Sequence, residues 1–82
     1  MTNVRTFIVK TIGPSNSKPA RIVINDLRMR KTIVIKEDQE SSATFYQQAI
    51  DRLVAMGIPI QNQSEGKGYM MLHSDNFTNQ IK

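Results

Sequence analysis

The spacing of hydrophobic side chains changes near the middle of the chain. Three segments of the first half alternate apolar and polar residues or are rich in β-branched residues, as half-buried β-strands are. The short link Arg28-Met29-Arg30 between the second and third segments predicts a β-hairpin. The three predicted strands are Val4–Ile12, Ala20–Leu27 and Lys31–Lys36.

A helical repeat follows these strands. Apolar residues recur every three or four positions up to Met56, and Gly57 followed by Pro59 is a helix stop signal. Ser41 or Ser42 is the expected N-cap. The apolar stripe of the predicted helix consists of Phe45, Ala49, Ile50, Leu53 and Met56.

The remaining segments complete one predicted domain that spans residues 1–82. Gln61–Gly68 is polar and predicts a loop, Tyr69–His73 predicts a last strand, and residues 75–82 predict a loosely held tail. The fold class is therefore α+β, with a small antiparallel sheet in β-β-β-α-β order and one helix packed on one face. The other face of the sheet meets water or a partner.

The composition bears on assembly and location. A chain of 82 residues buries only about two-thirds of its unfolded surface, and it has no cysteine for disulfides or zinc-thiolate sites. We therefore expect a homo-oligomer, a dimer or a tetramer. No apolar run is long enough to span a membrane, and Met1–Thr11 lacks the core of a signal peptide. We expect a cytoplasmic protein with no membrane partner.

Charge is divided unequally along the chain. Residues 1–36 carry eight basic side chains and one acid, whereas residues 37–82 carry three basic side chains and six acids. Acidic residues at the start of the predicted helix account for part of the difference, because they favour the positive end of the helix dipole. The basic half indicates an anionic partner, most simply a phosphate group.

Residue patterns typical of catalysis are weak. His73 is the only histidine and has no cysteine or carboxylate cluster beside it, so we expect a surface histidine rather than a metal ligand. There is no G-x-S-x-G motif, and the acids of residues 37–40 fit helix capping. We predict no enzymatic activity, no catalytic residue, no metal and no cofactor.

The loop from Ser15 to Arg21 is the strongest candidate for a binding site. Short polar side chains, turn amides and two cations are suited to hold an oxyanion, and an arginine can donate two parallel hydrogen bonds. A plain surface turn with solvated cations is the alternative. The candidate ligands of the phosphate are Lys18 and Arg21, with Ser15, Asn16 and Ser17 as hydrogen-bonding residues.

Tyr46 and Tyr69 are the candidate groups for stacking on a nucleobase, which contributes about 1–3 kcal/mol per base. Tyr46 stands beside the helical stripe, and Tyr69 alternates away from Met70 and Leu72. Packing in or around the core is the alternative for both rings. A basic sheet could also track a nucleic acid, but a basic helix and a KH G-x-x-G motif are both lacking. Nucleic acid is therefore the second choice of ligand, and inhibition of a host enzyme through the open sheet is a third hypothesis.

The order of motifs over residues 11–72 resembles small phage-encoded proteins. In these, a polar loop leads into an Arg-Ile strand, and a Val/Thr-Ile strand, a helix ending in Leu-x-x-Met-Gly and a Gly-Tyr strand follow. Tyr46 stands where a histidine is common. The matching segments here are Ser15–Ile22, Lys31–Ile35, Leu53–Gly57 and Gly68–Met71.

This resemblance implies a function in immune evasion. Proteins of this kind are similar to viral nucleotide sponges of the anti-CBASS type, oligomers that sequester the cyclic dinucleotide messengers of bacterial antiphage defence. A symmetric dimer would present each site residue twice to a ligand with two phosphates and two bases. The resemblance therefore implies a phage protein that binds a cyclic dinucleotide without turning it over, in the cytoplasm of a bacterial host.

Overall fold

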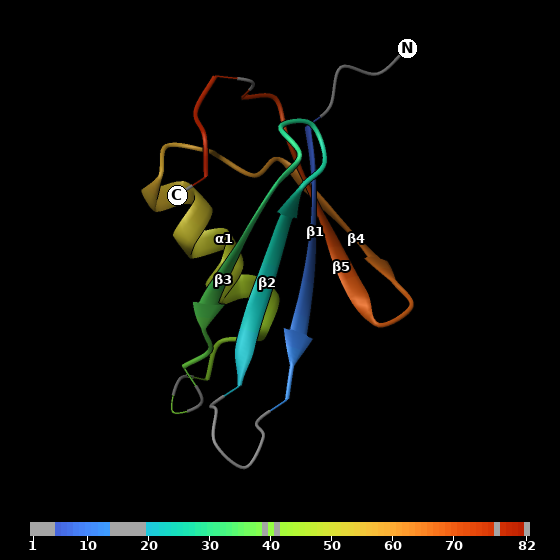
Figure 1. The fold of residues 1–82 in the computed structure, drawn as a ribbon, viewed down its shortest axis with the longest axis vertical. Helices are drawn as coiled ribbons and strands as arrows, with labels where there is room; N and C mark the ends of the chain where they lie inside the picture. The colour runs from blue at the N-terminus through green and yellow to red at the C-terminus, as the bar shows by residue number, and fades with distance from the viewer. Residues whose placement is uncertain (1–4, 14–19, 39, 41, 77, 82) are drawn as a thin grey trace.

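A computed structural model describes residues 5–13, 20–38, 40, 42–76 and 78–81. Within them the chain forms one five-stranded antiparallel sheet in the order β3-β2-β1-β5-β4, with helix α1 on one face (Figure 1). The predicted α+β class with a single helix is confirmed. The elements are β1 (Arg5–Ile12), β2 (Arg21–Asp26), β3 (Lys31–Lys36), α1 (Phe45–Ala55), β4 (Asn62–Gly66) and β5 (Tyr69–Ser74).

The two faces of the sheet have different surroundings. Helix α1 packs mainly over β1 and β2, and its buried residues Ala49 and Leu53 point into the same core as the strands. Ile58 and Ile81 fill the core from outside the sheet. We call this side the core face, and the residues that alternate onto it are Arg5, Phe7, Val9, Thr11, Ile22, Ile24, Asp26, Lys31, Ile33, Ile35, Gln63, Glu65, Met70, Leu72 and Ser74.

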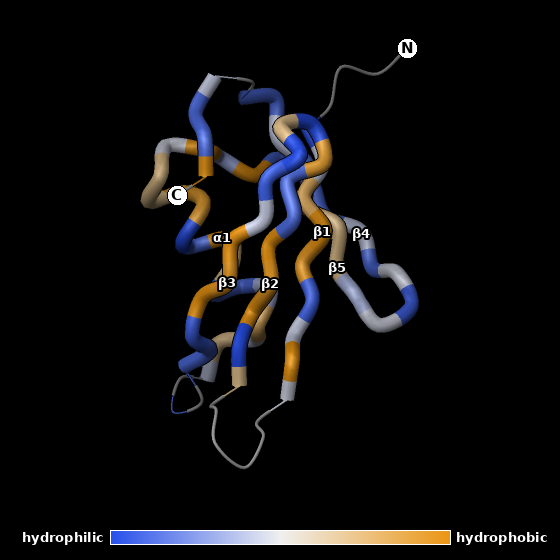
Figure 2. The backbone as a smooth tube through the Cα atoms, viewed as in Figure 1, coloured by the Kyte–Doolittle hydropathy of each residue, from blue (hydrophilic) through white to orange (hydrophobic). Residues whose placement is uncertain are grey.

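Strand β4 was not predicted, because the segment was expected to be a loop. The first four residues of β4 are polar and exposed, so β4 lacks the alternation of apolar and polar residues that marks a half-buried strand. Figure 2 shows these residues in pale and blue colours, without a hydrophobic position among them. The hairpin with β5 depends instead on its two-residue turn, where Gly68 has a φ of 82°. The element order is therefore β-β-β-α-β-β.

Helix α1 begins later than predicted and ends where predicted. Thr44 is the N-cap, and its hydroxyl accepts a hydrogen bond from the Gln47 backbone N–H at 3.2 Å. Ser42 is outside the helix, and Ser41 lies outside the described residues. At the other end Gly57 has a φ of 84°, and the N–H groups of Gly57 and Ile58 donate to the carbonyls of Val54 and Leu53. This is a Schellman motif, which explains the glycine.

The C-terminal segment is packed, contrary to the expected loose tail. Ile81 is fully buried in the core. The Asn79 side-chain amide donates to the carbonyls of Met56 and Gly57, both at 3.1 Å, and so fastens the segment to the end of α1. An isolated apolar residue in a polar stretch carries no periodic signal, so the sequence does not reveal this contact.

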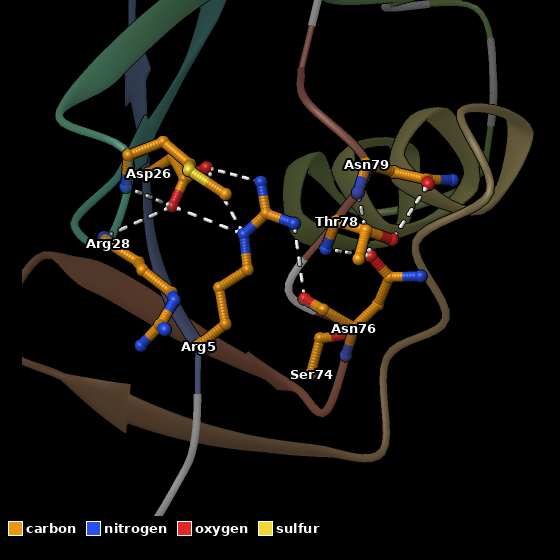
Figure 3. Close-up of polar contacts among 8 residues, drawn as sticks. Arg5, Asp26, Arg28, Ser74, Asn76, Thr78 and Asn79 are labelled. Atoms are coloured by element: carbon orange, nitrogen blue, oxygen red, sulfur yellow. Dashed lines mark hydrogen bonds and ion pairs between the residues drawn. The ribbon is translucent and has the colours of Figure 1, made fainter.

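A buried ion pair joins three parts of the fold on the core face (Figure 3). The side chains of Arg5 and Asp26 are fully buried, and Arg5 Nη2 donates to Asp26 Oδ2 at 2.5 Å. Arg5 Nη1 also donates to the Asn76 carbonyl, while Asp26 Oδ1 accepts from the backbone N–H of Arg28. The pair thus links β1, the β2–β3 turn and the segment after β5.

Candidate basic site on the open sheet face

No described helix or strand covers the face of the sheet opposite α1, and we call it the open face (Figure 1). Its residues are Thr6, Ile8, Lys10, Ile12, Arg21, Val23, Asn25, Thr32, Val34, Lys36, Asn62, Ser64, Gly66, Tyr69, Met71 and His73. Apolar side chains occupy much of its middle. None of these residues is acidic.

Arg21 lies at the first position of β2, with its side chain on the open face. It is half-buried, and its Nε is buried without a hydrogen-bond partner among the described residues. Ile12 and Lys36 lie opposite it on the two neighbouring strands. A buried guanidinium nitrogen without a partner is costly, because its hydration is lost and nothing replaces it.

Two lysines accompany Arg21. Lys36 lies directly opposite Arg21 on β3. Lys10 is the diagonal neighbour of Arg21 on β1, and the Cα atoms of two residues in such a diagonal pair are about 7–8 Å apart. Like charges opposite each other across strands are destabilising, and the open face has no carboxylate to compensate. We call Lys10, Arg21 and Lys36 the basic corner. An anion placed over it would relieve the repulsion and supply the missing acceptor.

The loop singled out from the sequence meets the sheet at this corner. It connects Ile12 to Arg21, which are paired in the β1–β2 register. Arg21 is therefore at the candidate site. The other predicted residues of the loop, Ser15, Asn16, Ser17 and Lys18, lie outside the described residues.

The two candidate tyrosines lie on opposite sides of the sheet. Tyr69 is on the open face, half-buried, and its ring covers Gly66, where a side chain would collide with it. Tyr46 belongs to α1, packs against the core and makes an edge-to-face contact with Phe45, with ring centroids 5.5 Å apart. Within one chain, Tyr46 therefore cannot share a ligand with Arg21, because the sheet separates them.

Sequence reasoning missed Lys10 and Lys36. Each lies on a predicted strand at a position that alternates away from the buried residues, so the signal was present. Antiparallel register brings them to Arg21: Lys36 lies opposite it on β3, and Lys10 is two positions from Ile12, which lies opposite it on β1.

His73 bridges three strands on the open face. Its Nδ1 lies 3.3 Å from Thr6 Oγ1, and its Nε2 lies 3.0 Å from Ser64 Oγ. A serine hydrogen-bonded to a histidine occurs in catalytic triads, where a carboxylate on the other ring nitrogen orients the histidine. Here the Thr6 hydroxyl, not a carboxylate, contacts that nitrogen. The described residues hold no group of histidines and carboxylates that could bind a metal. The geometry fits cross-strand hydrogen bonding.

The comparisons with known proteins add no family. No family model, curated protein or solved structure matches the chain. The one helix of the described residues is too short and too polar to cross a membrane. The candidate site therefore rests on its own geometry.

Proposed function

We propose that this protein binds and sequesters a phosphorylated nucleotide on its open face, without enzymatic turnover. The observation that carries the proposal is the basic corner on a sheet face without acids. The proposed ligand is a cyclic dinucleotide messenger of bacterial antiphage defence, and the protein is proposed to act as a phage-encoded, oligomeric nucleotide sponge in the host cytoplasm.

The basic corner supports a phosphate ligand on energetic grounds. Arg21 and Lys36 repel one another at a cross-strand pair, and Arg21 Nε lacks an acceptor in the described part of the chain. A phosphate oxygen is a strong acceptor for a guanidinium, and hydrogen bonds to charged groups contribute about 1.5–3 kcal/mol each. The free protein therefore holds its cations in an arrangement that a bound anion would stabilise.

Tyr69 supports a nucleoside as the remainder of the ligand. Continuation of the β1–β5 register beyond Val9 and Met70 places Tyr69 beside Lys10. A ring with a cation beside it can hold a base by stacking. Tyr46 of the same chain is on the other face and has no part in this ligand.

A single-stranded nucleic acid is the second candidate, supported by a second group of cations. Arg28 and Arg30 are exposed in the β2–β3 turn, at the opposite end of the sheet from Arg21. Six strand residues separate the two ends, about 20 Å. The open face between them carries no further lysine or arginine, which favours a compact ligand over a polyanion lying along the sheet.

Isothermal titration with cyclic dinucleotides and with a random oligonucleotide tests the proposal. We expect a cyclic dinucleotide to bind and to be recovered intact, and Arg21→Ala to weaken binding by about tenfold to a hundredfold. Arg52→Ala is the matched control, because Arg52 is exposed on α1, on the other side of the sheet.

Equal affinity in wild type and Arg21→Ala would reject the basic corner as the site. Preference for the oligonucleotide, with affinity falling steeply as salt rises, would replace the first candidate by the second. Binding of neither ligand would reject both and leave the protein-inhibitor hypothesis.

A further inference from the structure

The outer edge of β3 has unpaired backbone groups. The Glu37 N–H donates to the Ala20 carbonyl at 3.0 Å, and antiparallel pairs alternate, so Ile33 and Ile35 direct their backbone groups toward β2. Thr32, Val34 and Lys36 direct theirs away from the sheet. Across the described part of the chain, these outward N–H and C=O groups have no hydrogen-bond partner.

The other edge of the sheet, formed by β4, is partly blocked. On β4, the Gln63 N–H donates to the side chain of its neighbour Asn62 at 2.8 Å, which removes a donor from that edge. The side chains of β4 are polar on both faces. Native edges are commonly blocked in such ways, because an open edge is a template for another strand.

The hydrophobic core is also incomplete at β3. Ile22 and Ile24 of β2 are fully buried, whereas Ile33 and Ile35, which lie opposite them, remain half-buried. Val34, on the open face, is 55% exposed. Helix α1 packs mainly over β1 and β2, so an additional strand beside β3 would cover apolar surface that α1 leaves exposed.

We infer that the outer edge of β3 pairs antiparallel with β3 of a second copy of this chain, with Val34 opposite Val34 of the partner subunit. In this register the open faces of the two subunits lie on the same side of the joined sheet. The outward N–H and C=O groups of Thr32, Val34 and Lys36 form the hydrogen bonds between the two strands. It places Ile33 opposite the partner's Ile35, and Lys31 opposite the partner's Glu37.

The register is self-complementary in charge as well as in hydrogen bonding. A two-fold axis at Val34 repeats every contact, so Lys31 lies opposite the partner's Glu37 at both ends of the paired strands. Within one subunit the Glu37 carboxylate accepts a hydrogen bond from Thr11 Oγ1 at 2.8 Å, so the ion pair forms when this side chain turns toward the outer edge. Shifting by two residues in one direction would oppose Lys36 and the partner's Arg30, which repel one another. The charges of Lys31 and Glu37 thus favour one alignment.

Pairing would join two open faces into one surface. It places the partner's Thr32 beside Lys36, so each basic corner gains an uncharged hydrogen-bonding neighbour from the other subunit. The inference goes beyond the proposed function and does not depend on its ligand, because every contact named above is between protein groups.

Cross-linking of the ligand-free protein tests the pairing. The chain has no cysteine, so Val34→Cys introduces one thiol per subunit, and Cα atoms of a directly opposed hydrogen-bonded pair lie about 5.5 Å apart, within disulfide range. We expect a rapid covalent dimer under mild oxidation. Val54→Cys is the matched control, since Val54 on α1 is 53% exposed and is expected to stay largely uncross-linked.

Sedimentation velocity on charge-swapped variants tests the register. Lys31→Glu or Glu37→Lys alone should shift the protein from dimer to monomer, and the two substitutions together should restore the dimer. Circular dichroism checks that each variant is folded. A monomeric wild-type protein at high concentration, or cross-linking of Val34→Cys no faster than that of Val54→Cys, would overturn the inference. Ligand titration is measured separately, so a failed dimer and a failed ligand are distinguishable.

Discussion

Arg5 and Arg21 are the first residues of the neighbouring strands β1 and β2, and their surroundings are opposite in kind. Arg5 is on the core face, fully buried, and is paired with Asp26, a backbone carbonyl and the ring of Phe7, whose centroid is 4.9 Å away. Arg21 is on the open face, half-buried, beside Lys36, and its Nε has no described partner.

The difference separates cations that stabilise the fold from cations that are available to a ligand. A buried charge is tolerated only when it is paired and hydrogen-bonded, and Arg5 meets both conditions. Arg21 meets neither within the described residues. The same residue type therefore indicates function only where its local surroundings leave it unsatisfied.

Removal of the buried cation should have the largest effect on stability. Arg5→Met leaves Asp26 buried without its counter-ion, which we expect to lower the free energy of unfolding by about 3–5 kcal/mol. Urea denaturation measures the change. Arg5→Met combined with Asp26→Asn should recover part of the loss, because the orphaned charge is then absent. A loss of less than about 1 kcal/mol in the free energy of unfolding of Arg5→Met would contradict the buried pairing of Arg5 with Asp26.

A second prediction concerns the apolar packing of the core face. Ile81→Ala should lower the free energy of unfolding by about 2–4 kcal/mol, because it opens a cavity where the C-terminal segment meets the core. Leu27→Ala is the control, since Leu27 is exposed in the β2–β3 turn and should change stability little. Thermal unfolding measures both. Equal effects of the two substitutions would show that residues 78–81 do not close the core.

The smallest expected effect has the opposite sign. Arg21→Gln removes one charge of a repelling pair, so the free energy of unfolding should stay equal or rise by up to about 1 kcal/mol. Lys36→Gln should do the same, and the double variant should gain little beyond either single one. High salt should reduce the gain by screening the repulsion. A clear loss of stability in Arg21→Gln would mean that this arginine, like Arg5, is structural.

Much of the sheet was predictable because its central strands alternate. Ile22 and Ile24 are buried, whereas Val23 and Asn25 between them are half-buried, as the alternation of the sequence predicts. The short β2–β3 link sets the register between these two strands. Strand β4 could not be found this way, since both of its faces meet solvent. A strand without a buried face leaves no periodic trace in the sequence.

The candidate site was predictable only in part. Arg21 was identified from its loop, whereas Lys10 and Lys36 required strand register, a long-range property of the fold. Tyr46 is a stacking candidate in the sequence because it stands beside the predicted helical stripe, but in the structure it packs against the core, behind the sheet from Arg21. Asp26 looked like the one acid of a basic half-chain, but burial makes it the partner of Arg5.

The pairing of β1 with β5 has a consequence for synthesis of the chain. β1 is made first, and its hydrogen-bonding neighbour β5 follows roughly 60 residues later, which at translation rates of about 5–20 residues per second is a delay of about 3–12 s. During this time β1 can pair with β2, but its other edge lacks β5, and Phe7 and Val9 lack their neighbours Leu72 and Met70. A nascent chain of this topology therefore presents an open strand edge to the ribosome surface and to chaperones until its last strand emerges.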